Sequence, residues 1–312
     1  MNMDEHEKNV LEAIGRIDDW KGKKVEHEPA EGFTNSVWKV KVDGKAFFVK
    51  VPDKGTDTWI DRDSCHAANL AAAKAGIAPA VRYYFEDTGV EVFDWLEGYR
   101  SLISGDVYTE ELFHKMADTI RTFHQQDVKL PRTQTAFEQT AKLMSQVKVL
   151  GGYMPAEYDR MEWLVNSIED AVMTAGIDYV PCHNEHVAGN YMYNGDTGDI
   201  KLIDWEYASM NDASWDLAVH SGGQWFTESM DLELIRRYYG EYDEVNMAKL
   251  KLYQILADIK WGFWAITQAE GAPIGFDFYF WYGTKIDRLR HFWNDPRLDY
   301  WLNVVKGRSP FR

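Results

Sequence analysis

The sequence predicts an α+β protein with two lobes: a small antiparallel β-sheet lobe followed by a larger, mainly helical lobe. Three observations support this fold class. Alternating strand patterns with tight-turn residues occupy the first hundred residues, helical periodicity dominates after about residue 110, and no Pro/Ser-rich linker separates the two parts. We expect an N-lobe over residues 1–97 and a C-lobe over residues 98–312, packed as one unit.

The N-lobe begins with a helical pattern over residues 4–20. The strings SVWKVKV and KAFFVKV follow as strands, and the Asp43-Gly44 pair between them predicts a tight hairpin turn. Residues 61–75 predict an alanine-rich helix, and VRYYFED and GVEVFDWLEG complete a five-stranded sheet. We expect residues 93–98 to connect the lobes.

Amphipathic helices make up most of the C-lobe. The string TEELFHKMADTIRTFHQQ places four apolar residues on one helix face: Leu112, Met116, Ile120 and Phe123. At its end we interpret His124 as a structural cap. Residues 136–175 predict one or two further helices, and the chain after residue 283 predicts helix interrupted at Pro296.

The segment from Tyr179 to Leu217 contains the residue types that magnesium-assisted phosphoryl transfer requires. His183, Glu185, Asn190 and Asp204 have the spacing of a kinase catalytic loop, in which a carboxylate orients the acceptor hydroxyl and oxygen ligands hold Mg²⁺. The strings YMY and IKLI flank a turn sequence, so a hairpin is expected to bring Asn190 next to Asp204. Taken singly, these residues fit turn-capping or solvated roles, and only their joint spacing favours catalysis.

The strings HNEHVAGN, LIDWEYASMNDASWDLA and WGFWAITQ resemble the choline/ethanolamine kinase family, and in particular its bacterial LicA-type members. The resemblance covers nearly the whole chain. It implies a protein-kinase-like fold shared with the aminoglycoside phosphotransferases, ATP as the phosphoryl donor and Mg²⁺ as a cofactor. It also implies that Glu185 is the catalytic acid, that Asn190 and Asp204 are metal ligands, and that Asp216 braces the catalytic loop.

The resemblance also implies a nucleotide site in the N-lobe. EGFTNS, residues 31–36, is similar to the family's nucleotide loop, so Asn35 and Ser36 are expected near phosphate. Lys50 occupies the position of the lysine that contacts the α- and β-phosphates. Without the catalytic segment downstream, a plain turn and an exposed strand-end lysine would explain these residues.

Two positions depart from the family pattern. Glu185 replaces an aspartate, and the added methylene moves the carboxylate by ~1 Å. Cys65 replaces the helix glutamate that is expected to pair with Lys50. The same helix offers three alternative partners: Asp61, Asp63 and His66.

The acceptor prediction depends on aromatic residues near the C-terminus. A quaternary ammonium has no hydrogen to donate, so proteins bind it on ring faces. The resemblance implies a box formed by Trp261, Trp264, Phe276 and Trp281, with Trp225 as a further ring. Spacing alone favours a core role for Trp261 and Trp264. The chain reads Gly222-Gly223-Gln224 where the family usually has an acid facing the cation.

Composition limits the partners and the setting. A formal net charge of −16 disfavours nucleic acid and anionic membranes and mildly favours a cationic substrate. Cys65 and Cys182 are the only cysteines, which are too few for a disulfide framework or a zinc site, so we expect a reducing cytoplasm. No apolar stretch reaches the length of a membrane span.

These observations predict an ATP-dependent phosphotransferase that acts on a small amino-alcohol, choline first. One alternative is an aminoglycoside or other small-alcohol kinase on the same fold, although an aminoglycoside would require a strip of carboxylates rather than rings. Another is a catalytically silent pseudokinase that binds ligand, which the residues at positions 65 and 185 keep open. The oligomeric state stays undetermined by the sequence.

Overall fold

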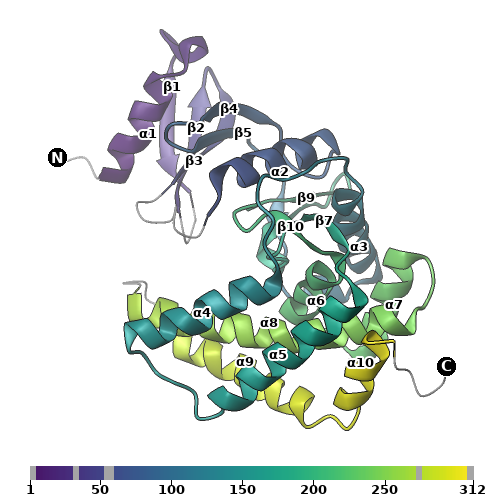
Figure 1. Cartoon of the computed structure of the whole chain (residues 1–312). Coiled ribbons are helices and arrows are strands. Elements are labelled where there is room, and N and C mark those ends of the chain that lie inside the picture. Colours follow the sequence, from purple (N-terminus) through teal and green to yellow (C-terminus); the bar gives the residue numbers. More distant parts are fainter. Residues whose placement is uncertain (1–4, 31–34, 53–59, 272–275, 308–312) are drawn as a thin grey trace.

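The computed structural model describes residues 5–30, 35–52, 60–271 and 276–307. The β-sheet lobe lies at the top of Figure 1 and the helical lobe below it, so the predicted two-lobed α+β fold class is confirmed. In the described ranges, the helices are too short or too polar to cross a membrane.

The N-lobe contains the predicted five-stranded sheet, which is antiparallel. The structure adds its strand order, β1-β2-β3-β5-β4. Its strands are β1 (Val25–Pro29), β2 (Asn35–Val42), β3 (Lys45–Pro52), β4 (Val81–Phe85) and β5 (Val90–Asp94). The predicted hairpin joins β2 to β3 through Asp43 and Gly44, whose φ angles are 50° and 87°. Positive φ at both positions gives the turn the twist of its flanking strands.

Two helices flank this sheet. Helix α1 (Glu5–Gly15) buries Val10 and Ile14 against the sheet core. Helix α2 (Arg62–Lys74) starts where the Asp61 side chain accepts a hydrogen bond from the Ser64 N–H (2.9 Å). The inner face of α2 packs in one cluster with C-lobe residues that include Trp205. The two lobes therefore share part of their core.

The segment between β5 and β6 (Arg100–Ser101) connects the lobes. Strand β5 ends at Asp94, whereas β6 already pairs with β8 (Tyr191–Asn194) of the C-lobe. We propose that the lobe boundary lies within this connection, at the predicted position between residues 97 and 98.

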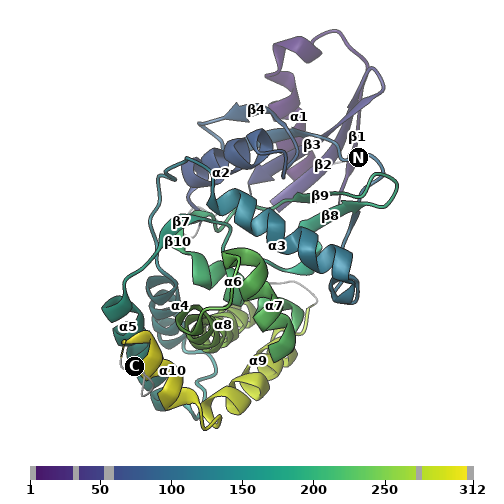
Figure 2. The ribbon, with the colours of Figure 1, turned by 90° about the vertical axis from the view of Figure 1, so that its right-hand side faces the viewer.

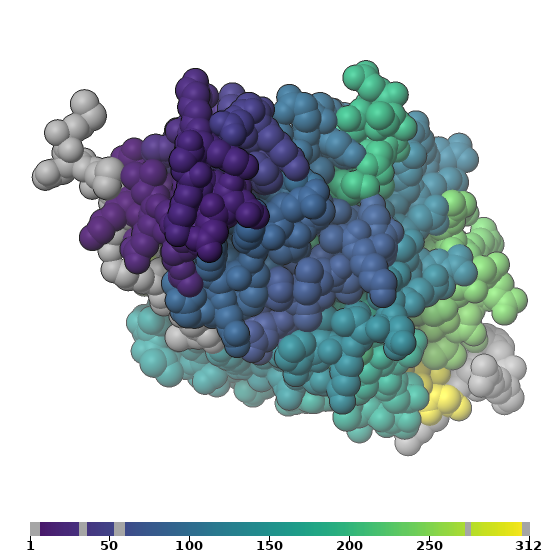
Figure 3. Space-filling view, turned by 90° about the horizontal axis from the view of Figure 1, so that it is seen from above, coloured from purple at the N-terminus to yellow at the C-terminus, as the bar shows by residue number. Residues whose placement is uncertain are grey.

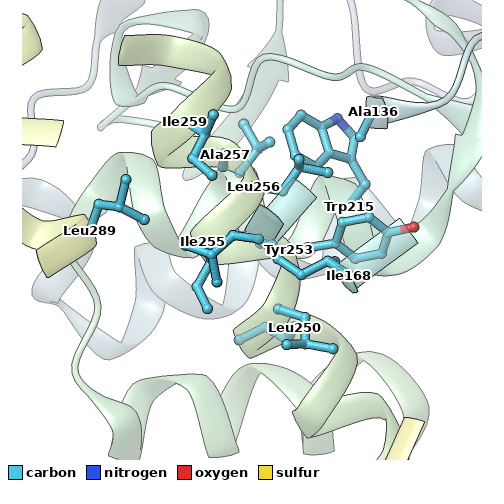
Figure 4. Packing of buried hydrophobic residues seen from close by; sticks show 14 of the residues in the cluster. Ala136, Ile168, Trp215, Leu250, Tyr253, Ile255, Leu256, Ala257, Ile259 and Leu289 are labelled. Carbon is cyan, nitrogen blue, oxygen red and sulfur yellow. The ribbon is translucent and has the colours of Figure 1, made fainter. Parts of the chain in front are cut away.

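Helices form most of the C-lobe: α3 (Glu110–His124), α4 (Ala136–Leu150), α5 (Tyr158–Ala175), α6 (Ala213–Gln224), α7 (Glu228–Tyr239), α8 (Glu244–Gly271), α9 (Phe278–Trp293) and α10 (Leu298–Val305). The long helix α8 lies at the centre of the lobe and is buried over most of its length, because apolar residues occur all around it. Figure 4 shows its side chains packed with those of neighbouring helices. In this packing, the Trp215 ring meets the Tyr253 ring edge-on at 5.9 Å.

Two small sheets lie between the N-lobe and the helices. Strand β7 (Tyr179–Cys182) pairs with β10 (Ser209–Asp212), and β8 and β9 (Asp199–Leu202) form the predicted hairpin. In Figure 2 this hairpin lies beside α3 and beneath the N-lobe sheet. Viewed from above, purple and blue N-lobe residues cover much of this face, and the yellow C-terminal residues are visible only at one edge (Figure 3).

Candidate active site

The predicted catalytic segment, residues 183–190, connects β7 to β8 and is braced by helix α6. The fully buried Asp216 carboxylate of α6 accepts hydrogen bonds from the N–H groups of His183 (2.8 Å) and Asn184 (2.7 Å). Asn184 has a φ of 69°, so the chain turns sharply at this point. The structure thus shows the bracing role that the resemblance implied for Asp216.

Two histidine side chains also contact the Asp216 carboxylate. The Nε2 atoms of His124 and His186 each lie 3.0 Å from its carboxylate. Burial opposes ionisation, but His186 and His124 outweigh it and hold the pKa of Asp216 well below its usual range. The expectation that His124 caps its helix is wrong, because its side chain points inward to Asp216 and to the Tyr238 hydroxyl (2.6 Å).

His183 has the structural role expected for it. Its Nδ1 accepts a hydrogen bond from the Glu185 N–H (3.2 Å), and its Nε2 lies 2.9 Å from the Ile203 carbonyl. Burial lowers the pKa of His183 to about 4, with a further contribution from His186. A neutral His183 therefore ties the catalytic loop to the chain just before Asp204.

The structure brings Glu185, Asn190 and Asp204 together. The Asn190 Nδ2 donates to the Glu185 carbonyl (3.0 Å), and the Asn190 carbonyl accepts from the Ile203 N–H (2.9 Å). This leaves the Asn190 Oδ1 available as a ligand beside Asp204, whose φ of 67° turns the chain at the end of β9. An amide oxygen and a carboxylate in this arrangement fit Mg²⁺, which prefers hard oxygen donors.

The charges at this site favour the ionised forms of Asp204 and Lys50 and disfavour the ionised form of Glu185. Burial opposes ionisation of Asp204, but Lys50 outweighs it and lowers the pKa of that carboxyl. The pKa of Glu185 is raised, first by burial and then by the nearby charge of Asp204. The Lys50 ammonium lies 2.8 Å from Asp204 and 2.9 Å from Glu206, and these carboxylates raise the pKa of Lys50 against the effect of burial. Strand β3 of the N-lobe is thereby joined to the segment of the C-lobe that follows β9.

The expected partner of Lys50 on helix α2 is replaced by Glu206. This carboxylate is only 3 % exposed, and the Arg62 guanidinium at the start of α2 lies 3.6 Å from it. The suggestion that Asp61, Asp63 or His66 substitutes for the missing helix glutamate is wrong, because Lys50 pairs with Asp204 and Glu206. Asp61 instead caps α2, and His66 contacts Glu91. The carboxylate that pairs with Lys50 in place of a helix glutamate is therefore Glu206, two residues after Asp204.

Helix α2 is held to the sheet by a different carboxylate. Glu91 of β5 lies 2.9 Å from the His66 Nδ1 and accepts a hydrogen bond from the Asn69 Nδ2 at 2.9 Å. The carboxylate that joins α2 to the sheet therefore belongs to strand β5 and not to the helix. Cys65 fills the remaining space as a buried thiol, whose pKa burial raises above its usual range.

The predicted nucleotide loop is only partly described. Residues 31–34 and the side chain of Asn35 lie outside the described parts of the chain. Ser36 is paired with Val51 on the neighbouring strand, one position beyond Lys50. Ser36 thus lies on the strand adjacent to the lysine that the resemblance assigned to phosphate.

The predicted acceptor rings form a continuous aromatic run. Its successive ring-centroid distances are 5.9 Å for Tyr207–Trp261, 5.7 Å for Trp261–Trp264, 5.7 Å for Trp264–Phe278, 4.9 Å for Phe278–Phe276 and 6.4 Å for Phe276–Trp281. Trp261 and Trp264 are only partly buried against the C-lobe core, and Phe276 is 44 % exposed. The run begins at Tyr207, one residue after Glu206, and so leads away from the catalytic groups.

Trp225 lies in a different environment. Its ring packs against the Arg288 guanidinium, 4.6 Å from the ring centroid. Arg288 donates to the Gly222 carbonyl and pairs with the buried Asp258 (2.8 Å). Trp225, Gly222 and Arg288 border a small cavity of about 80 Å³ beside α6 and α9. That Trp225 contributes to acceptor binding stays a prediction.

The glycines at the position of the expected acid serve the catalytic loop. A Cβ at Gly223 would lie 3.1 Å from the His186 carbonyl, so only glycine allows this close approach without a shift. Gln224 then donates to the same carbonyl (2.8 Å). Together they give α6 a second attachment to the loop, beyond the one through Asp216.

Sequence reasoning missed three residues of this region. Tyr207 follows the string LIDWE directly, Glu91 lies between two valines of β5, and Lys260 precedes the W-x-x-W pattern. The charges at positions 91 and 260, each with an apolar residue on both sides, were the available signals, because a buried charge needs a partner.

Comparisons with known proteins agree with this geometry. The choline/ethanolamine kinase family profile matches residues 28–230. A probable choline kinase of Arabidopsis thaliana is 24 % identical, with 87 % of this chain and 88 % of that protein covered.

Solved structures show the same fold. A choline/ethanolamine kinase family protein of Mesorhizobium loti superposes with a TM-score of 0.83 at 22 % identity, covering 97 % of this chain and 99 % of that one. The choline kinase LicA of Streptococcus pneumoniae gives a TM-score of 0.76 at 26 % identity, covering 91 % and 99 %. The protein-kinase-like fold implied by the resemblance is confirmed, and the chain belongs to the choline/ethanolamine kinase family.

Proposed function

We propose that this protein transfers the γ-phosphoryl group of ATP to the hydroxyl of a small amino-alcohol, with choline as the first acceptor to test. The observation that carries this proposal is the convergence of Glu185, Asn190 and Asp204 beside Lys50, where the two lobes meet. Membership of the choline/ethanolamine kinase family supports the reaction class.

Each catalytic group has a separate task. Lys50 binds the α- and β-phosphates, exchanging its contacts with Asp204 and Glu206 for phosphate oxygens. Asn190 and Asp204 would hold Mg²⁺, which neutralises charge on the phosphates when bound. Ser36, on the strand next to Lys50, is positioned to add a hydroxyl donor, and Asn35 precedes it on the same strand.

The reaction is an in-line displacement. The acceptor hydroxyl oxygen forms a bond to the γ-phosphorus while the bond from that phosphorus to the bridging oxygen of ADP breaks. The hydroxyl proton passes to the Glu185 carboxylate. Burial and Asp204 raise the pKa of Glu185, and a carboxylate with a raised pKa accepts a proton more readily.

The aromatic run supports a cationic acceptor, because ring faces bind an ammonium that has no other partner. Trp261, Trp264, Phe276 and Trp281 belong to this run, which starts next to Glu206. Both cysteines are buried free thiols, which supports our inference of a reducing, cytoplasmic setting.

A coupled assay of ADP release tests the proposed function with choline, ethanolamine and kanamycin as acceptors. We expect turnover with the amino-alcohols, and a fall of 10²-fold or more, on the order of a lost general base, in Glu185→Gln. Glu162→Gln, at a half-exposed side chain on α5, is the matched control and should keep full activity.

Each alternative gives a distinct result in the same assay. Turnover with kanamycin alone would identify an aminoglycoside kinase. Stabilisation by Mg-ATP without turnover on any acceptor would identify a pseudokinase. Full turnover in Glu185→Gln under saturating Mg-ATP would remove Glu185 from the mechanism.

A further inference from the structure

Lys260 is a buried ammonium at the inner end of the aromatic run. Its side chain leaves α8 one residue before Trp261, is 2 % exposed, and its Nζ has no hydrogen-bond partner. Three rings surround this Nζ, with centroids at 3.9 Å for Trp261, 5.1 Å for Tyr207 and 5.4 Å for Trp215. The protein therefore places a cation of its own where the resemblance predicted the substrate's cation box.

Burying an ammonium without hydrogen bonds is costly, so the surroundings must compensate. Ring faces attract a cation through their quadrupoles, and three of them surround Lys260. Burial has the largest effect on the pKa of Lys260 and lowers it, and Arg132 lowers it further. The carboxylates of Glu185 and Asp216 attract the ammonium and act in the opposite direction. Because Glu185 is the proposed catalytic acid, Lys260 lies close enough to the reacting groups for its charge to matter there.

The outer end of the run carries a second lysine. The Lys285 ammonium lies 4.4 Å from the Trp281 ring centroid and is also buried. Resident cations therefore occupy ring faces at both ends of the run. The rings between them, among which Trp264 and Phe276 are partly or largely exposed, remain for a ligand.

We propose that Lys260 determines the charge preference of the acceptor site: its ammonium holds the Tyr207 and Trp261 ring faces, so a cationic head group binds against Trp264 and Phe276 under repulsion from Lys260. This inference rests on the proposed function, because it takes the aromatic run as the acceptor site. It deepens that function by predicting that removing the Lys260 charge strengthens the binding of a quaternary ammonium selectively.

The test compares two ligands of the same shape. Choline carries a trimethylammonium, and 3,3-dimethyl-1-butanol replaces its nitrogen by carbon and is neutral. Because burial lowers the pKa of Lys260 to about 7, dissociation constants are measured by titration calorimetry at pH 6, where the ammonium is charged. The measurements are made without ATP, for the full chain and for Lys260→Met. We expect choline to bind about tenfold more tightly to Lys260→Met, as follows from removing one like charge several ångströms away, while the neutral alcohol changes less than about twofold.

The full chain alone gives a second readout, which holds if the variant fails to fold. An unoccupied aromatic cage favours choline over its neutral isostere, because the rings attract only the cation. With Lys260 in place, we expect the neutral alcohol to bind at least as tightly as choline. Choline binding tenfold more tightly than the isostere in the full chain, or equal choline affinity with and without Lys260, would overturn the proposal.

The binding data also separate this inference from the proposed function. If no alcohol is phosphorylated but the two ligands respond to Lys260→Met as expected, the role of Lys260 stands and the kinase reaction does not. If choline is phosphorylated but neither ligand's affinity responds to the substitution, the reaction stands and the role of Lys260 is refuted. Absence of binding by both ligands to both proteins would refute the aromatic run as the acceptor site.

Discussion

At the scale of single residues, the rings of the aromatic run differ in their contacts. Trp261 and Trp281 each have a lysine ammonium of the protein over the ring, and Trp264 has none among its described contacts. Trp264 is partly buried and touches rings on both sides, Trp261 and Phe278, each at 5.7 Å. It has no resident ammonium among its described ring contacts, whereas Trp261 has Lys260. Trp264 is therefore the tryptophan of the run best placed to contact a substrate cation.

Replacing Trp264 by alanine should raise the dissociation constant for choline about tenfold, because one cation–π contact contributes about 0.5–2 kcal/mol. Titration calorimetry measures this change. Trp163→Ala is the control, since Trp163 is 52 % exposed on α5, and it should leave choline binding unaltered. Equal affinities in both variants would remove Trp264 from the acceptor site.

His220 makes the stability of the C-lobe dependent on pH. It is fully buried on α6, and neither of its ring nitrogens has a hydrogen-bond partner. Burial, followed by the influence of His186, lowers the pKa of His220 well below its usual value of 6.5. The unfolded chain therefore binds this proton at pH values where the folded protein does not, and stability rises with pH in that range.

The free energy of unfolding should accordingly fall as the pH drops below 6.5, by about 2 kcal/mol at pH 5 for this one imidazole. Denaturant unfolding at pH 5, 6, 7 and 8 measures the dependence. His220→Phe removes the titrating group and should flatten the curve while leaving stability at pH 8 similar. Parallel curves for the two proteins would contradict the assignment.

At the scale of elements, helix α6 contacts the catalytic loop at two places, near its start at Asp216 and at its end at Gly223 and Gln224. Asp216 receives two loop N–H groups, Gly223 allows the close approach of the His186 carbonyl, and Gln224 donates to it. These contacts add to those that His183 and Asn190 make with Ile203, so the loop backbone is fixed from two sides. The geometry around Glu185 is thus determined by residues more than thirty positions away in the sequence.

Asp216→Asn should destabilise the protein by about 3 kcal/mol, because it removes a buried charge that two N–H groups and two histidines face. Activity measured well below the unfolding temperature should also fall, since the loop loses its brace. Asp118→Asn breaks a half-exposed pair with Arg237 and should cost less than about 1 kcal/mol. A similar cost for both substitutions would show that Asp216 has no special role.

At the scale of the whole molecule, ion pairs join the two lobes at the proposed nucleotide site. Lys50 of the N-lobe sheet contacts Asp204 and Glu206 of the C-lobe, and Arg62 of α2 lies near the same Glu206. Helix α2 also contributes to the core shared by the lobes. A nucleotide bound between the lobes would therefore contact both of them and should stabilise the protein as a unit.

Mg-ATP at a hundred times its dissociation constant should add about 2.7 kcal/mol to the stability of the folded protein. Thermal unfolding with and without Mg-ATP measures this gain. Lys50→Met should lose most of it relative to its own ligand-free state, because the phosphates lose their cation. Lys74→Met, at the exposed end of α2, is the control and should keep the full gain. An undiminished gain in Lys50→Met would place the nucleotide elsewhere.

Local patterns in the sequence were sufficient for most of the fold. The Asp43-Gly44 turn, the end of α2 at Gly76 and the β8–β9 hairpin follow from rules that act over a few residues. The joint spacing of Glu185, Asn190 and Asp204 was also sufficient to bring these groups together, because one hairpin connects them.

The sequence by itself thus determined the two-lobed architecture and the family, and it pointed to the groups that we propose as catalytic. Only the tertiary structure determined which charged side chains contact one another. The pairing of Lys50 with Glu206 joins segments more than 150 residues apart, and Lys260 enters a cage whose rings come from α6, α8 and the segment after β9. Such partners depend on how whole helices pack, and no local preference of the chain encodes that packing.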